Sequence, residues 1–348
     1  MNGFLRFGLL LAGLIVVLLL TLAAFQLPIV DSVKLIFDGA FSDKFAWSRS
    51  AVKMTPLLLT GLGMVIAWRA GVYNIGGEGQ FVVGAIFGAA VGKGLIGANA
   101  AAIPGGSLLV LVVCAIGGAL WAWIAGWLYV RRGVEVVIST ILLNFIAIQL
   151  LGFAVSGPLQ EQKRQVPQTD LLPESLMLAR FDRQTDVHLG TVLALVMAVV
   201  LTIFLYRTVA GYRLRLVGDN PKVARVNYID PGRVQLSAMA LSGAMCGLAG
   251  GVEYLGLVGQ LGTTFPQQWG FLGIPVALLG GLNPMLTAGA AFFFGALFAG
   301  TENLARFTPA GTTIVYVIQA TAVLAYVGLN GLRKARPKPE EESASTPS

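Results

Sequence analysis

Long, nearly uninterrupted runs of apolar residues dominate this chain and set its expected architecture. Residues 7–27 and 108–130 are two examples, and each is long enough for a helix to cross roughly 30 Å of hydrocarbon. Strands of a membrane barrel would instead alternate apolar and polar positions over about ten residues. Because lipid cannot hydrogen-bond to the backbone, the runs predict membrane-spanning α-helices and an all-α fold.

The hydropathy pattern predicts about ten such segments in one transmembrane domain over residues 1–330. Segments 54–70 and 269–282 are short, and we expect broken or partial crossings there rather than full spans. Residues 331–348 are polar and predict a disordered cytoplasmic tail. The predicted segments are 7–28, 54–70, 79–97, 105–130, 134–155, 189–207, 234–258, 269–282, 285–302 and 309–330.

Composition supports this architecture and limits what the net charge means. Hydrophobic residues make up 56% of the 348 residues and charged residues only 12%, against about 25% charged in soluble domains. The net charge of +7 does not indicate a nucleic-acid partner, because the basic residues lie in loops between apolar runs.

Clusters of arginine and lysine give the orientation expected from the positive-inside rule. With ten crossings, Arg6, residues 131–132, the loop 208–233 and the basic residues 333–338 all fall on one side. We expect that side, with both termini, to be the cytoplasm. The polar loop 156–188 is then extracytoplasmic and has room for a short surface helix.

No grouping of side chains in the sequence predicts catalysis. His188 is the single histidine, and Cys114 and Cys246 lie singly inside apolar runs, where we expect packing residues. No nucleophile with a base and no metal-ligand cluster is apparent. Residues 88–94 resemble a phosphate-binding loop, but the spacing is wrong by one residue. The chain is expected to bind no metal or cofactor and to hydrolyse no ATP by itself.

Polar residues among the apolar segments are the candidates for function. Asn74, Glu78 and Gln80 lie in a glycine-rich break between two segments. A carboxylate at the centre of a membrane helix costs about 2.5–3.5 kcal/mol on insertion scales, so Glu78 needs a partner or water. It either lines a solute path or has a structural role, capping a helix or pairing with Arg69.

Further polar residues lie within or beside the apolar spans. Together they suit a pathway for a polar, uncharged solute. Each alone is equally consistent with a hydrogen bond between packed helices. They are Asn144, Gln149, Glu253, Gln260 and Asn283, with Glu302 and Asn303.

Glycines spaced four residues apart predict close contact between helix backbones. Two such ladders occur, in residues 84–92 and 243–251. Residues 71–80 also resemble residues 251–260, since both fit Gly-Val-x-x-aliphatic-Gly-x-x-Gly-Gln. The match is consistent with an inverted repeat and equally with chance in a glycine-rich chain.

The basic loop 211–225 is the strongest local feature. Asp219 or Asn220 can cap a helix that has Pro221 at its first position. A short, basic, amphipathic helix can dock into a groove on a partner protein. It can equally be an anchor on lipid headgroups, and charge alone does not separate the two.

Several stretches of the chain resemble the permeases of nucleoside and simple-sugar ABC importers, in the branched-chain amino acid, ribose and nucleoside permease superfamily. The similarity covers residues 50–330, and Asn-Ile-Gly-x-Glu-Gly-Gln at 74–80 is typical of the nucleoside-like branch. Residues 271–275 depart from the family pattern, which leaves the substrate open. The matching stretches are 53–63, 69–80, 133–144, 211–225 and 276–284.

The resemblance implies a type II-like importer fold in a bacterial inner membrane and nucleoside transport by alternating access. The implied partners are a second related permease in a heterodimer, cytoplasmic ATPase subunits that hydrolyse the ATP, and an extracytoplasmic binding protein. Simple sugars or branched-chain amino acids, or an ion-coupled secondary transporter, are the alternatives. The loop would couple to the ATPase through Arg213, Arg215, Gly218, Asp219, Asn220, Pro221, Ala224 and Arg225.

Overall fold

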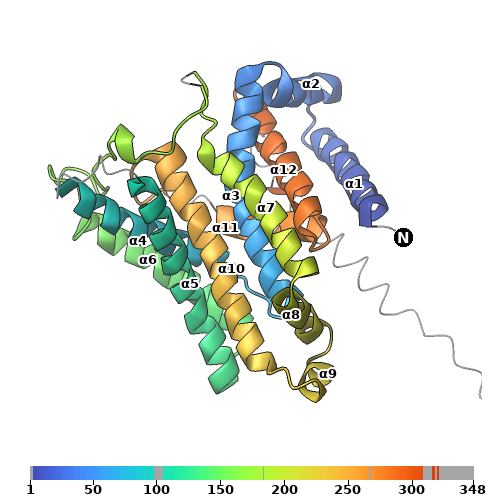
Figure 1. Ribbon diagram of the computed structural model, residues 1–348. Helices are drawn as coiled ribbons and strands as arrows, with labels where there is room; N and C mark the ends of the chain where they lie inside the picture. Colours follow the sequence, from blue (N-terminus) through green and yellow to red (C-terminus); the bar gives the residue numbers. More distant parts are fainter. Residues whose placement is uncertain are drawn as a thin grey trace, which may run out of the picture.

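A computed structural model describes residues 3–97, 105–182, 184–265, 268–308, 316–317 and 320 (Figure 1). Helices form most of this part of the chain, which confirms the all-α class, and no β-strand occurs within it. A 3-10 turn, η1 (Glu174–Leu176), and a π-helical turn, η2 (Tyr254–Val258), accompany the α-helices. The α-helices are α1 (Gly3–Ala24), α2 (Ile29–Phe41), α3 (Lys44–Arg69), α4 (Gly77–Gly97), α5 (Gly106–Arg132), α6 (Val136–Ser156), α7 (Leu189–Arg207), α8 (Val209–Asp219), α9 (Pro221–Val226), α10 (Pro231–Glu253), α11 (Trp269–Leu279) and α12 (Pro284–Ala305).

Seven helices of the described part are long and apolar enough to cross a membrane: α3, α4, α5, α6, α7, α10 with its π turn, and α12. They correspond to seven of the predicted segments, and α1 and α11 cover two more. Most of the predicted segment 309–330, and all of the predicted tail 331–348, lie outside the described residues. A multi-pass membrane protein is therefore confirmed, whereas the count of about ten crossings stays a prediction.

Of the two segments predicted as broken or partial crossings, 54–70 belongs to a helix of 26 residues and 269–282 contains a helix of only 11. Helix α3 begins at Lys44, ten residues before the predicted start, because the Asp43 carboxylate accepts the Ala46 N–H at 2.7 Å and caps the helix. Helix α11 has only 11 residues and is about 16 Å long, so it is a partial crossing as expected. The sequence did not predict α2, because charged residues at positions 31, 34 and 38 interrupt its apolar run.

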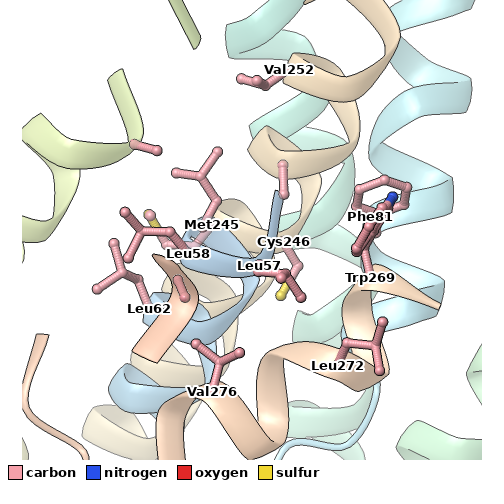
Figure 2. Close-up of a cluster of buried hydrophobic side chains, with 14 of the residues drawn as sticks. Leu57, Leu58, Leu62, Phe81, Met245, Cys246, Val252, Trp269, Leu272 and Val276 are labelled. Carbon is pink, nitrogen blue, oxygen red and sulfur yellow. The ribbon is translucent and has the colours of Figure 1, made fainter. Parts of the chain in front are cut away.

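The core lies where α3 and α10 run through the middle of the bundle (Figure 1). Within α3, 89% of the membrane-spanning window is buried inside this single chain, so lipid scarcely touches it. Figure 2 shows side chains from four helices meeting around α3. They are Leu57, Leu58 and Leu62 of α3, Phe81 of α4, Met245, Cys246 and Val252 of α10, and Trp269, Leu272 and Val276 of α11.

The predicted close contact between backbones is confirmed for part of each glycine ladder, at Gly84, Gly243 and Gly247, whereas the other ladder glycines face side chains. A methyl group on Gly84 of α4 would approach Gly247 Cα to 2.5 Å and Cys114 O to 2.8 Å. On Gly118 of α5 it would approach Gly247 Cα to 2.7 Å and would overlap the carbonyl oxygen of Gly243. Helices α4, α5 and α10 therefore pack at a separation that only glycine permits.

The predicted inverted repeat has no counterpart in local structure. In the first copy, Gly71 has a φ of +74° and a non-helical segment follows it, whereas its counterpart Gly251 is inside α10. In the second copy Gly259 has a φ of +69°, whereas its counterpart Gly79 is helical. The two sequences therefore adopt different conformations.

The two long loops lie at opposite ends of the bundle (Figure 1). Helices α8 and α9 lie at one end, and there Val130 at the end of α5 contacts Gly232 at the start of α10. The basic positions 131–132 and the loop 208–233 thus share one end, as the charge pattern predicts. The loop 156–188 lies at the other end and contains the expected short helix as η1.

Substituting Gly118 with alanine is expected to lower thermal stability, because overpacking a tight contact typically costs about 1–3 kcal/mol. Gly152→Ala in α6 is the matched control, since a methyl group there meets no atom within 4 Å. The thermal stability of both variants is measured from size-exclusion profiles of the detergent-solubilised chain after heating. Equal melting of the two variants would show that the contact between α5 and α10 is not tight.

Candidate functional site

Residues 70–76 form a non-helical connection that runs from the end of α3 back into the bundle. Asn74 in this segment is fully buried, and Gly77 just after it lies against the Met64 side chain. Met64 is five residues before the end of α3, which places Gly77 about 7 Å inside the bundle along that helix. Non-helical backbone at this depth persists only where protein or water satisfies its polar groups.

Asn74 bonds to its own segment and to a distant helix. Its Oδ1 accepts the Gly76 N–H at 2.8 Å, and its Nδ2 donates to Ser242 Oγ of α10 at 2.9 Å. Two further bonds of 3.0 Å join its amide to that of Gln80. Asn74 and Gln80 are therefore committed to holding the connection against α10.

Asn144 of α6 fixes the same connection from the opposite side. Its Oδ1 accepts the Gly79 N–H at 2.8 Å, and its Nδ2 donates to the carbonyl oxygen of Ile75 at 3.1 Å. The side chain is 2% exposed. Of the two predicted roles for Asn144, the contacts correspond to the hydrogen bond between packed elements.

Glu78 caps a helix that is distant in the sequence. Its Oε2 accepts the Gly270 N–H at 2.8 Å and its Oε1 accepts the Gln268 N–H at 3.1 Å, and the side chain is 1% exposed. These N–H groups begin α11, whose first residue also accepts a bond from Thr60 Oγ1 of α3. Since Thr60 is near the middle of α3, α11 starts inside the membrane-spanning region.

Of the two structural roles considered for Glu78, pairing with Arg69 does not occur, whereas capping a helix does. Arg69 instead donates from Nε to the carbonyl oxygen of Leu282 at 2.8 Å, just beyond the end of α11. The two residues thus bind opposite ends of α11. The positive end of the α11 dipole takes the place of a basic partner for Glu78.

Glu253 and Trp269 form a second buried polar pair, at the junction of α10, its π turn and α11. They are 3% and 5% exposed, and their side chains interact. Glu253 Oε1 and Trp269 Nε1 nevertheless lack a well-formed hydrogen bond among the described residues. Nearby, Lys53 of α3 forms an ion pair with Glu302 of α12. Glu253 Oε1 and Trp269 Nε1 therefore retain capacity to form a hydrogen bond with a polar solute.

The remaining predicted pathway residues lie apart from this pair. Asn283 caps α12, because its Oδ1 accepts the N–H groups of Met285 at 3.0 Å and Leu286 at 3.3 Å. Gln260 is half-buried in the connection after η2. Gln149 is exposed on α6. The structure therefore does not gather the predicted residues into one polar cavity.

The basic loop contains two helices, α8 and α9, where the sequence predicted one. The Asn220 side chain accepts the N–H groups of Lys222 at 3.0 Å and Val223 at 3.2 Å, and Pro221 occupies the first position of α9. Asn220 is thus the cap, and Asp219 ends α8.

Residues predicted to couple to an ATPase divide into a group that packs on the bundle and an exposed group. Gly218 packs directly on the carbonyl group of Arg69, with no room for a side chain. Ala224 is buried, and the Arg215 guanidinium lies 5.1 Å from the centre of the Tyr206 ring. The exposed group is Arg213, Asp219, Asn220, Pro221 and Arg225.

Val226 and Tyr228 were missed by the sequence analysis. Their side chains are 79% and 101% exposed at the tip of the loop, and Tyr228 adopts a φ of +57°. A bulky residue in this left-handed region is strained, and such positions cluster at functional sites. Apolar groups at the end of a basic loop form a surface suited to a partner protein. Their exposure depends on the tertiary fold, so no clear signal for it is present in the sequence.

His188 has a structural role outside the membrane-spanning helices. Its Nδ1 accepts the Gly190 N–H at 3.1 Å and caps α7. Burial, together with the charge of Arg180, lowers the pKa of His188 to about 4 against the opposing effect of Asp186. The ring is therefore neutral at physiological pH, as this hydrogen bond requires.

Comparison with known proteins identifies the class. Residues 47–326 match the family model for the permease component of the branched-chain amino acid transport system. The chain belongs to this family. It is a multi-pass permease subunit of an ABC importer, a transport component without its own ATPase site.

Named relatives come from archaea and bacteria. The glucose ABC transporter permease protein TsgB13 of Haloferax volcanii is 30% identical over 87% of this chain and 81% of its own length. The guanosine ABC transporter permease protein NupP of Bacillus subtilis is 29% identical over 89% of each chain. A second guanosine ABC transporter permease protein of that organism, NupQ, is 28% identical over 80% of this chain and 89% of its own.

Replacing Glu78 with alanine is expected to destabilise the chain, because an N-cap is worth about 0.5–2 kcal/mol and the α11 N–H groups would stay buried without acceptors. Glu78→Gln retains one acceptor and should be intermediate. Glu135→Ala is the control, since Glu135 is exposed at the α6 N-cap and makes no capping bond. Melting curves in detergent measure all three, and a Glu78→Ala curve that matches the control contradicts the assignment.

Proposed function

We propose that this permease imports nucleosides by alternating access, together with a second related permease, cytoplasmic ATPase subunits and an extracytoplasmic binding protein. Its relation to NupP and NupQ supports the substrate. The buried pair Glu253 and Trp269, whose polar atoms lack a well-formed hydrogen bond among the described residues, suits a polar, uncharged solute. In this proposal the loop 156–188 faces the binding protein, and the termini and α8–α9 lie in the cytoplasm.

The α8–α9 loop is the proposed contact with the ATPase. It combines exposed basic residues, Arg213 and Arg225, with the exposed apolar side chains of Val226 and Tyr228. The partner subunits would hydrolyse the ATP, and this chain would convert their motion into solute movement.

The single observation that carries the coupling proposal is the backbone contact between Gly218 and Arg69. Gly218 belongs to α8, while Arg69 ends α3 and also binds Leu282 after α11. Displacing α8 would therefore move the end of α3 and the end of α11 together. Since α11 begins at the Glu78 cap beside Trp269, this motion would reach the pair of Glu253 and Trp269.

Glucose is the second candidate substrate, because TsgB13 covers most of this chain at 30% identity. We expect vesicles that contain the complete importer and lumen-accessible ATP to take up labelled guanosine. Excess unlabelled nucleoside should reduce that uptake at least tenfold, and excess glucose should leave it within twofold. Competition by glucose alone would assign the sugar instead, and uptake driven by an ion gradient without ATP would exclude an ATP-driven importer.

Val226→Asp is expected to reduce ATP-dependent uptake at least tenfold and to abolish copurification of the ATPase, because a carboxylate would be buried at an apolar contact. The same substitution at Val134, which is 39% exposed at the same end of the bundle but outside the loop, should leave both within twofold. Permease abundance in the membrane should be unchanged in both variants. Normal uptake by Val226→Asp would contradict the coupling role of α9.

A further inference from the structure

Gln149 has an unusual position in a membrane-spanning helix. It lies 13 residues after the start of α6 and seven before its end, and its side chain is exposed. It makes no hydrogen bond with any described residue. Among the described residues of the seven long apolar helices, every other exposed polar side chain lies within two turns of a helix end. Within the described part of these helices, Gln149 is therefore the exposed amide nearest to the middle of a span, where hydrocarbon is expected.

The amide is the one polar group in a straight apolar stripe along α6. The stripe positions recur at intervals of three and four residues, so they lie on one helix face. The apolar members are all at least half exposed. We define the α6 stripe as Ile138, Leu142, Phe145, Ile146, Gln149 and Phe153.

Helix α7 provides the comparison. Like α6, it has only 33% of its membrane-spanning window buried inside the chain. Its exposed face is apolar throughout the span, from Val192 to Ile203, which suits lipid. The two helices thus differ in the central amide and not in their overall exposure. Lipid chains have no donor or acceptor for that amide, so α6 requires a protein neighbour where α7 does not.

A groove beside the stripe favours a packed helix as that neighbour. Helix α6 lies at the edge of the bundle and packs on α4 and α5 (Figure 1). These three helices line an apolar cavity of about 560 Å³, in which Leu150 and Phe153 face Phe87 and Leu120. Phe153 belongs to both the groove and the stripe, so the two surfaces are continuous. Ridges of a neighbouring helix can enter such a groove.

We propose that the α6 stripe is the surface on which the second permease of the importer packs, with the Gln149 amide hydrogen-bonded to a polar group of that subunit. This inference rests on the proposed function, because it identifies the surface used by the second permease proposed there. The partner would present a membrane-spanning helix with a donor or acceptor at the depth of Gln149.

Photo-crosslinking in membranes that contain the complete importer tests the surface. We expect benzoylphenylalanine introduced at Phe145 to give an adduct whose partner peptides, identified by mass spectrometry, come from a permease of this family. The same probe at Val199, on the exposed face of α7, is the matched control and should give no such adduct. An adduct at Val199 alone, no protein adduct at either position, or attachment of Phe145 to another class of subunit would overturn the proposal.

A second variant tests the amide itself. Gln149→Leu should lower the yield of the Phe145 adduct about threefold, the average effect of a hydrogen bond between membrane helices. Gln149→Asn should recover part of the yield. Neither should change the melting of the isolated chain, because the amide makes no hydrogen bond with any residue that the structure describes. An undiminished yield in Gln149→Leu would overturn the role of the amide.

ATP-dependent uptake measured on the same membranes separates the two proposals. Uptake with no adduct at Phe145 would overturn only the α6 surface. A permease adduct in membranes without ATP-dependent uptake would support the surface and contradict the proposed function.

Discussion

The bonds from Glu78 to the start of α11 join the non-helical connection 70–76 to a helix that begins inside the bundle. Lipid supplies no acceptors for the N–H groups of a helix that begins inside the membrane, so a side chain must do so. Glu78 is also in the first turn of α4. One carboxylate therefore faces the positive ends of two helices, which explains how it stays buried without a basic partner.

The same constraint explains the amides and glycines around residues 70–76. Asn74 and Asn144 each bond to a backbone group of this connection, and thereby replace the bonds that a continuous helix would make internally. These bonds require close approach, and Gly270 lies directly on the backbone of Glu78 with no room for a Cβ atom. The polar and the small residues of this region thus act together: they allow the helix to be interrupted while its backbone groups stay hydrogen-bonded.

Much of this architecture could be predicted from sequence because it depends on local chemistry. Apolar runs predicted the long helices, the length of 269–282 predicted a partial crossing, and the Asn-Pro pair predicted the start of α9. The partner of Glu78 could not be predicted, since the acceptor bonds go to backbone N–H groups about 190 positions away. Backbone groups carry no residue-specific signal, and Arg69 was the nearer but incorrect choice. The exposure of Tyr228 likewise depends on how α8 and α9 fold together.

Helix α11 is fixed at both ends by residues that border the connection 70–76. Glu78 binds its start and Arg69 binds the chain just after its end, while Gly218 of α8 packs on the Arg69 carbonyl. Contacts between backbones transmit a displacement more completely than contacts between long side chains, because no rotamer change can absorb it. In the proposed importer, a movement of the loop at the ATPase would consequently shift α11 as a unit. A half-length helix suits this role, since it can move within the bundle without withdrawing a polar end from water.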